Sequence, residues 1–113
     1  IDFWASWCAP CRLEMPSSHK LQGEYKTKDI IFVYLSIDTD KEKWKRASEQ
    51  ENIIANKNNF LALNYPSAIF FKELELKTIP RYLLFDKKGS LIHENAPNPS
   101  SDEIRTLFNK NLK

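Results

Sequence analysis

The sequence predicts an α/β sandwich, in which helices cover both faces of a mixed sheet. Three observations indicate this class. The segment Ile30–Asp38 is almost continuously apolar, as is typical of a central parallel strand. Helical patterns alternate with short strand patterns along the first two thirds of the chain. An antiparallel hairpin and a closing helix follow, so the expected order of elements is β-α-β-α-α-β-β-α.

The first predicted strand and helix surround the sequence's most distinctive motif. Ile1–Trp4 is expected to end a buried strand. Pro10 suits the first turn of the next helix, because a proline there has no N–H to leave unpaired. This helix is predicted to run to about Tyr25. Pro16 is expected to kink it, because proline cannot donate to the carbonyl four residues earlier.

Two capping boxes, each a Ser or Thr followed three residues later by Glu, predict two more helices. Thr39 is expected to cap a helix with Trp44 and Ala47 on its buried side. Ser100 is expected to cap the closing helix, one face of which is apolar. The residues of that face are Ile104, Leu107, Phe108 and Leu112.

The region between these helices carries weaker signals. Residues 53–64 are ambiguous, because several asparagines interrupt them. Ser67–Leu74 is predicted to be a short helix, followed by a strand at Arg81–Phe85. A turn at residues 86–89 leads into a second strand at Ser90–His93. The short helix is expected to bury Phe70, Phe71 and Leu74.

The bulk properties suit one domain over residues 1–113. A net charge of +2 with scattered lysines gives no indication of nucleic-acid or membrane binding. No apolar run approaches the ~20 residues that a membrane span requires. The chain opens inside a predicted strand. We therefore expect residues upstream in a longer chain, including any targeting segment or membrane anchor.

Cys8 and Cys11 are the only two cysteines, and they are separated by two residues. A structural zinc site needs four ligands, and a disulfide-stapled domain carries more cysteines along the chain. This pair is predicted to lie where a helix begins, and the N–H groups and dipole there stabilise an anion. Such an environment lowers a cysteine pKa from about 8.5 to roughly 3.5–7.5, which predicts a reactive thiolate at Cys8.

A dithiol of this kind exchanges disulfides in two steps. Cys8 attacks a substrate disulfide and forms a mixed disulfide, and Cys11 then attacks Cys8 and releases the reduced substrate. Cys11 must lose its proton in the second step. Asp2 is the candidate acceptor, since it is an acid in an apolar strand, where burial raises a carboxyl pKa toward neutrality.

Residues 1–12 resemble the active-site segment of the thioredoxin superfamily, and Leu13–Pro16 resembles its extracytoplasmic TlpA/ResA-like branch. Thr78–Pro80 resembles the cis-proline loop of this superfamily, and Asp86–Gly89 the turn of its terminal hairpin. The helical stretch between residues 39 and 74 also fits that branch. The resemblance implies a thioredoxin-like three-layer sandwich with a central mixed sheet. The usual first strand and helix of that fold are absent from this sequence.

The resemblance also implies roles for individual residues. Cys8 is expected to be the nucleophile, Cys11 the resolving cysteine and Asp2 the buried acid. Pro80 is expected to be cis and to lie against the disulfide, while the backbone of Ile79 pairs with an extended substrate. The predicted substrate-binding residues are Trp7, Ala9, Pro10, Ile79 and Pro80.

The function expected from this resemblance is that of an enzyme that reduces disulfides of exported proteins in the bacterial periplasm or cell envelope. Its partners would be a disulfide-containing protein and an upstream thiol donor. No cofactor is implied, and membrane contact would arise only through an anchor outside this chain. The same residues also suit a disulfide oxidase or isomerase, because the motif does not set the direction of electron flow.

Several other interpretations stay open on the residues alone. Cys8 and Cys11 suit a non-enzymatic module that binds a partner or a soft metal ion such as Cu(I). They also suit an inert structural disulfide, although so short a loop adds little stability. Asp2 is also compatible with a plain buried hydrogen-bonded acid, and Pro80 with a trans proline that begins a strand. A peroxidase lacks support, because the expected lone cysteine in a Thr/Pro-rich loop is not found.

Overall fold

The computed structural model describes residues 1–63, 65 and 69–112. Its main sheet has four strands in the order β3-β2-β1-β4. In chain order these strands are β1 (Asp2–Trp4), β2 (Tyr34–Ser36), β3 (Asn59–Leu61) and β4 (Arg81–Tyr82). β1, β2 and β3 run parallel, and β4 pairs antiparallel with β1, so the sheet is mixed as predicted.

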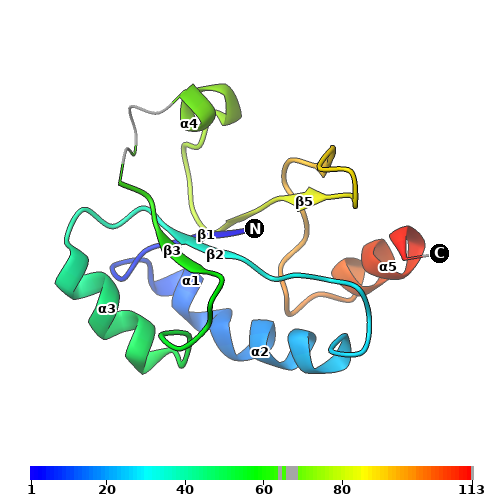
Figure 1. Ribbon diagram of the computed structural model, residues 1–113, viewed down its shortest axis with the longest axis horizontal. Coiled ribbons are helices and arrows are strands. Elements are labelled where there is room, and N and C mark those ends of the chain that lie inside the picture. The colour runs from blue at the N-terminus through cyan, green and yellow to red at the C-terminus, as the bar shows by residue number, and fades with distance from the viewer. Residues whose placement is uncertain (64, 66–68, 113) are drawn as a thin grey trace.

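The helices lie on both faces of this sheet, which confirms the α/β sandwich. They are α1 (Ala9–Leu13), α2 (Met15–Glu24), α3 (Lys41–Gln50), α4 (Ile69–Leu74) and α5 (Asp102–Asn111). Figure 1 shows α1, α2 and α3 on one side of the sheet and α4 on the other. α5 packs beside α2, where the rings of Tyr25 and Phe108 meet edge to face with centroids 5.2 Å apart.

The helix predicted to run from Pro10 to Tyr25 is divided into α1 and α2 by Glu14. The break lies where Pro16 cannot donate to the carbonyl of Arg12, as expected. Glu14 instead ends α1 with its N–H directed at the carbonyls of Cys11 and Arg12. The consequence is a second helix that begins at Met15, four residues after the second cysteine.

The strand predicted at Ile30–Asp38 is much shorter in the structure. β2 covers only Tyr34–Ser36, and Ile31 is 74% exposed. Strand pairing explains the shorter length. Tyr34 is the first residue of β2 that pairs with a neighbouring strand, opposite Asp2 on β1 and Asn59 on β3. Ile30 and Phe32 pack against the cluster that contains α5. The hydrophobicity of the segment therefore reflects its partial burial, whereas the length of the strand is set by its hydrogen-bonded pairing with β1 and β3.

Both helix caps lie one residue beyond their predicted positions. Asp40, and not Thr39, caps α3, because its Oδ1 accepts hydrogen bonds from the N–H groups of Glu42 and Lys43 at 3.0 and 3.2 Å. Ser101, and not Ser100, caps α5 by accepting from the N–H of Ile104 at 3.3 Å. In each case two neighbouring residues are of a type that caps helices well, and the second of the two is the cap in the folded chain.

The apolar faces of both helices are largely as predicted. In α3, Ala47 is buried and Trp44 is partly buried against the main core. In α5, Ile104 and Phe108 are buried, and two further residues pack against them. Those two are Leu107 and Leu112.

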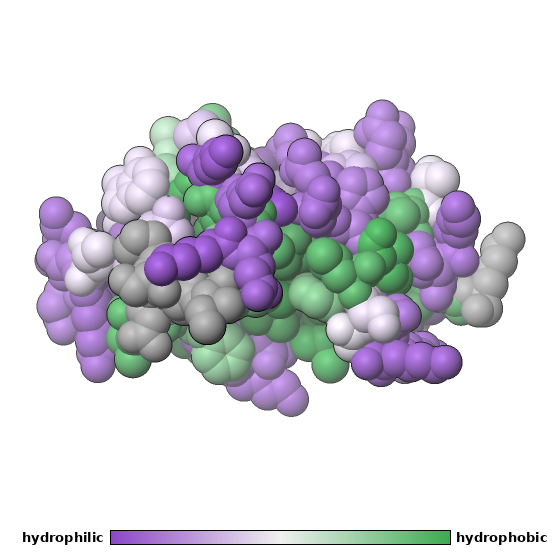
Figure 2. Space-filling view, turned by 90° about the horizontal axis from the view of Figure 1, so that it is seen from above, coloured by the Kyte–Doolittle hydropathy of each residue, from purple (hydrophilic) through white to green (hydrophobic). Residues whose placement is uncertain are grey.

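The ambiguous segment 53–64 contains β3, which extends the sheet beyond β2. The short helix is described from Ile69 onward, and its predicted start at Ser67 lies outside the described residues. Phe71 is buried as predicted, but Phe70 is 42% exposed, which contradicts the prediction. A helix of six residues turns only one narrow face to the sheet. Seen from the side on which α4 lies, apolar side chains are visible near the middle of this face (Figure 2).

The strand predicted at Arg81–Phe85 divides at Leu83. β4 belongs to the main sheet, whereas β5 (Leu84–Phe85) pairs with β6 (Leu91–His93) in a separate two-stranded sheet. β6 begins at Leu91 and not at Ser90. The predicted turn is present, with Gly89 at φ +83°, a conformation that glycine adopts without strain.

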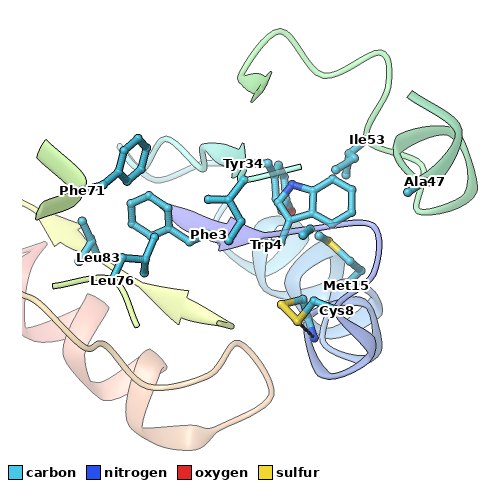
Figure 3. Close-up of a cluster of buried hydrophobic side chains, with 13 residues drawn as sticks. Phe3, Trp4, Cys8, Met15, Tyr34, Ala47, Ile53, Phe71, Leu76 and Leu83 are labelled. Carbon is cyan, nitrogen blue, oxygen red and sulfur yellow. Dashed lines mark hydrogen bonds between the residues drawn. A yellow bond between two sulfur atoms is a disulfide. The ribbon is translucent and has the colours of Figure 1, made fainter. Parts of the chain in front are cut away.

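The main core surrounds β1. Phe3 and Trp4 are fully buried, and Figure 3 shows Phe3 close to Phe71 and Trp4 close to Met15, on opposite sides of the strand. Cys8 and Cys11 belong to the same buried cluster. The cysteine pair therefore rests directly on the core of the sheet.

Trp4 and Trp7 allow a test of this packing. Trp4→Ala is expected to lower the free energy of unfolding by about 3–5 kcal/mol, because it leaves a large cavity in the core. Trp7→Ala removes a side chain that is 66% exposed, and is expected to change stability by about 0.5 kcal/mol or less. Urea unfolding of both variants measures the difference. Equal losses of stability would contradict the placement of the two indoles.

Candidate active site

Cys8 and Cys11 form a disulfide at the start of α1, with an S–S distance of 2.06 Å and a Cα–Cα distance of 5.3 Å. Cys8 occupies the N-cap position, and its Sγ accepts a hydrogen bond from the N–H of Cys11 at 3.2 Å. The same N–H is available to a thiolate when the pair is reduced. The local structure thus suits a stabilised thiolate at Cys8.

The disulfide is nearly covered, and the residues beside it are exposed. Cys8 is 4% exposed and Cys11 1%, so the two cysteines differ little in exposure. Trp7, Ala9 and Pro10 are exposed on either side of Cys8. A partner would therefore approach Cys8 along these three residues.

Two groups of partly buried hydrogen bonds, made by Asp38 and Arg12, hold the loop that presents Cys8. Both carboxylate oxygens of the buried Asp38 accept from the N–H of Ser6, at 3.2 and 2.9 Å, and Oδ1 also accepts from the Ser6 hydroxyl at 2.6 Å. Arg12 donates from Nη1 to the carbonyl of Ser6 at 3.2 Å and from Nε to Glu51 at 2.6 Å. The loop is thereby tied to the end of β2 and to the residue after α3.

Asp38 and Arg12 were not selected as site residues from the sequence. An acid at the end of an apolar strand is the one signal that pointed to Asp38. Its partner Ser6 lies 32 residues away, so only the packed sheet shows what it does.

Asp2 lies in the central strand of the sheet, and its Oδ1 is buried with no hydrogen-bond partner among the described residues. Burial raises the pKa of this carboxyl to about 7. The charge of Glu14 adds to the rise in this pKa. The direction of this pKa shift agrees with the sequence prediction, and the role of Asp2 in proton transfer stays a prediction.

Glu14 was missed as a site residue. It lies at the break between α1 and α2, and its carboxylate accepts from the hydroxyl and the N–H of Ser100 at 2.7 and 3.2 Å. Burial raises the pKa of Tyr82, and the charges of Asp2 and Glu14 raise it further. An acid directly before a helix break is the sequence signal that was available.

The cis peptide bond lies between Ile79 and Pro80. Ile79 lines an open pocket of about 250 Å³ together with Trp7. The remaining lining residues are Ile37, Tyr65, Leu76, Lys77 and Thr78. The structure therefore brings together Trp7 and Ile79, two of the predicted substrate-binding residues. The contact of Pro80 with the disulfide and with substrate stays a prediction.

The described residues offer no obvious metal site and no membrane span. Within residues 1–63, 65 and 69–112, no three His, Cys, Asp or Glu side chains gather as a group that could hold a metal ion. His19 makes a hydrogen bond to the carbonyl of Glu51, and His93 accepts one from the N–H of Asn95. No helix in this part of the chain combines the length and hydrophobicity that a membrane span requires.

Comparison with known proteins identifies the family. The model of the family described as Redoxin matches residues 1–109. The chain belongs to the Redoxin family. Among curated members, the thiol-disulfide oxidoreductase ResA of Bacillus thuringiensis subsp. konkukian is 26% identical over 115 residues, which cover 97% of this chain and 61% of that protein. The chain thus spans 61% of the length of the ResA proteins to which it is similar.

Solved structures agree with the Redoxin assignment. A candidate thiol-disulfide oxidoreductase from Bacteroides vulgatus is 34% identical, with a TM-score of 0.82 over 99% of this chain and 76% of the other. A candidate thiol:disulfide interchange protein DsbE from Chlorobium tepidum shares the fold at 23% identity, with a TM-score of 0.79 over 99% of this chain and 77% of the other. These likenesses confirm the thioredoxin-like fold and the TlpA/ResA-like resemblance.

The raised pKa of Asp2 predicts how stability depends on pH. In the unfolded chain this carboxyl loses its proton near 3.8, and in the fold near 7, so folding stability falls as pH rises between these values. Asp2→Asn should therefore be more stable than the parent by about 2–4 kcal/mol at pH 8.5, and nearly equal to it at pH 4. Urea unfolding of the oxidised protein at several pH values measures this gap.

Asp29→Asn is the matched control, because Asp29 is exposed. This variant should show no gap that grows with pH. A gap for Asp2→Asn that stays constant from pH 4 to 8.5 would contradict a raised pKa at Asp2.

Proposed function

We propose that this chain is a thiol-disulfide oxidoreductase with Cys8 as the nucleophile and Cys11 as the resolving cysteine. The observation that carries this proposal is the disulfide at the start of α1, flanked by the exposed Trp7 and Ala9. Membership of the Redoxin family supports it, as does the similarity to proteins named thiol-disulfide oxidoreductase.

The reaction begins with the reduced pair. The Cys8 thiolate attacks one sulfur of a substrate disulfide, forming a mixed disulfide and expelling one substrate thiolate. Cys11 then attacks the Cys8 sulfur, expels the second substrate thiolate and closes the Cys8–Cys11 disulfide. Two electrons pass from the cysteine pair to the substrate, and a thiol donor returns the pair to its reduced form by the same steps. The cysteines carry the electrons, so the reaction needs no cofactor.

Asp2 is proposed to accept the proton that Cys11 loses in the second step. Its pKa of about 7 supports this role, because both forms of the carboxyl are populated at neutral pH. The acid also lies in β1, the strand that leads into the loop before Cys8. A carboxyl with the ordinary pKa of 3.8 would be a weaker acceptor at the same position.

The substrate is proposed to be an extended segment of a protein disulfide. Trp7 and Ile79 line one pocket, and Ala9 and Pro10 are exposed beside Cys8. Such a surface suits a chain that lies across the disulfide and pairs with the backbone of Ile79. Pro80 would complete this surface through its cis bond to Ile79.

The direction we propose is reduction of exported proteins in the bacterial periplasm or cell envelope, with an upstream thiol donor as the second partner. The named relatives ResA and DsbE support this setting. Oxidation would use the same residues, so the reduction potential of the pair decides between the two directions.

The two cysteines have distinct roles that substitution separates. Cys8→Ser should abolish reduction of a disulfide-bonded peptide, since the attacking thiolate is lost. Cys11→Ser should instead trap the mixed disulfide, because nothing resolves it. Mass spectrometry under non-reducing conditions detects the trapped species. Turnover by the Cys8 variant, or trapping by that variant in place of the Cys11 variant, would overturn the assignment of roles.

A redox titration in thiol buffers tests the direction. The fluorescence of Trp4 should report it, because Trp4 belongs to the same buried cluster as both cysteines. A midpoint near about −270 mV is expected for a reductant, and one near about −120 mV would indicate a disulfide donor. The absence of any reversible transition would overturn the redox function as a whole.

A further inference from the structure

Three polar side chains form a row across the middle of the sheet. Asp2 on β1 is the register partner of Tyr34 on β2 and of Tyr82 on β4. Residues directly opposite each other on neighbouring strands point to the same face. Ser18 of α2 donates to or accepts from the hydroxyl of Tyr34 at 2.7 Å, so this face is the one that α2 covers.

The two tyrosines differ in their hydrogen bonds. The hydroxyl of Tyr34 is engaged by Ser18 and by the side-chain amide of Gln22. Tyr82 is only 8% exposed, and its hydroxyl is buried without a hydrogen-bond partner among the described residues. Oδ1 of Asp2 is likewise buried without a partner among these residues. Buried polar groups are rarely left unsatisfied, and such a pair calls for a shared partner.

Asp2 and Tyr82 line the same cavity of about 70 Å³. A water molecule needs about 10–15 Å³ by this measure, so the cavity has room for water that bridges the two groups. Ser18 and Tyr34 add polar atoms to its wall. The segment after β6 and the helix α5 contribute apolar side chains, among them Pro97, Ile104 and Phe108.

The ionisable side chains around Asp2 are Tyr34 on β2, Tyr82 on β4 and Glu14 between α1 and α2. Burial raises the pKa of Tyr34 to about 12 and moves that of Tyr82 in the same direction. Both phenols therefore keep their protons at neutral pH, and Tyr82 is a permanent hydrogen-bond donor.

We propose that Tyr82 is a positioning residue for proton transfer, and that its hydroxyl donates a water-mediated hydrogen bond to the carboxylate of Asp2. This inference rests on the proposed function, in which Asp2 accepts the proton of Cys11. The bond stabilises the ionised form of Asp2, which is the form that accepts a proton. Without it, a smaller fraction of Asp2 is ionised at neutral pH, and the attack of Cys11 on the mixed disulfide slows.

The test follows this attack directly. Reduced protein is mixed with 5,5′-dithiobis(2-nitrobenzoate) in a stopped-flow instrument. Cys8 releases the first nitrothiobenzoate, and Cys11 releases the second. The rate of the second phase is measured from pH 5.5 to 9. Tyr82→Phe is expected to raise the midpoint of this profile by about one pH unit, which lowers the rate at pH 7 about fivefold.

Tyr34→Phe is the matched control, because the Tyr34 hydroxyl is engaged by Ser18 and Gln22. This variant should lose stability and keep the midpoint of the parent. Equal midpoints for Tyr82→Phe and the parent, or equal shifts in both tyrosine variants, would overturn the role of Tyr82.

Asp2→Asn separates this inference from the function on which it rests. In the Asp2→Asn background, Tyr82→Phe should have no further effect on the second phase. If Asp2→Asn itself leaves the rate and the profile unchanged, the proposed role of Asp2 fails. If Asp2→Asn removes the profile while Tyr82→Phe matches the parent, only the role of Tyr82 fails.

A measurement on the parent protein covers the case in which Tyr82→Phe does not fold. The ¹³Cζ resonance of Tyr82 should shift with the ionisation of Asp2, with the same midpoint as the Asp2 carboxyl resonance. A Tyr82 resonance that does not respond while Asp2 titrates would overturn the proposed hydrogen bond.

Discussion

The pairing of β1 with both β2 and β4 is the constraint on which the site depends. Successive residues of a strand face opposite sides, so Phe3 lies toward Phe71 of α4 and Trp4 toward Met15 of α2 (Figure 3). Asp2, two residues before Trp4, faces the same side as Trp4. The strand then leads into the loop that carries Cys8. One central strand thereby fixes the core, the buried acid and the origin of the cysteine loop.

Burial of Asp2 connects stability with chemistry. An ionised carboxyl in the middle of a sheet destabilises the fold at neutral pH, because it has lost its hydration. The same loss of hydration raises its pKa to about 7, which suits the proposed proton exchange with Cys11. Tyr34 and Tyr82 flank this group without adding a charge, so the sheet holds the acid in a polar strip within an apolar core.

The cysteine loop is held from outside the strand as well. Asp38 accepts from Ser6, and Arg12 joins the carbonyl of Ser6 to Glu51. These hydrogen bonds restrain Ser6 and Arg12 on either side of Cys8, while Trp7 stays exposed. Glu14 interrupts the helix just after the cysteines. Glu14 there faces the 96–100 segment and contributes its charge near Asp2.

Local patterns in the sequence determined the cysteine pair, the helix start at Pro10 and the break before Pro16, because each depends on neighbouring residues. The raised pKa of Asp2 also followed from a charge placed in an apolar strand. The lengths of β2 and β4, the exposure of Phe70 and the choice of Asp40 and Ser101 as caps were decided by the tertiary structure. The tertiary structure also decided the contact of Asp38 with Ser6 and the position of Tyr82 opposite Asp2. Strand register brings together residues that are far apart in the chain, as it does for Asp2 and Tyr82. Such register depends on the packing of the whole sheet, and no local pattern carries it.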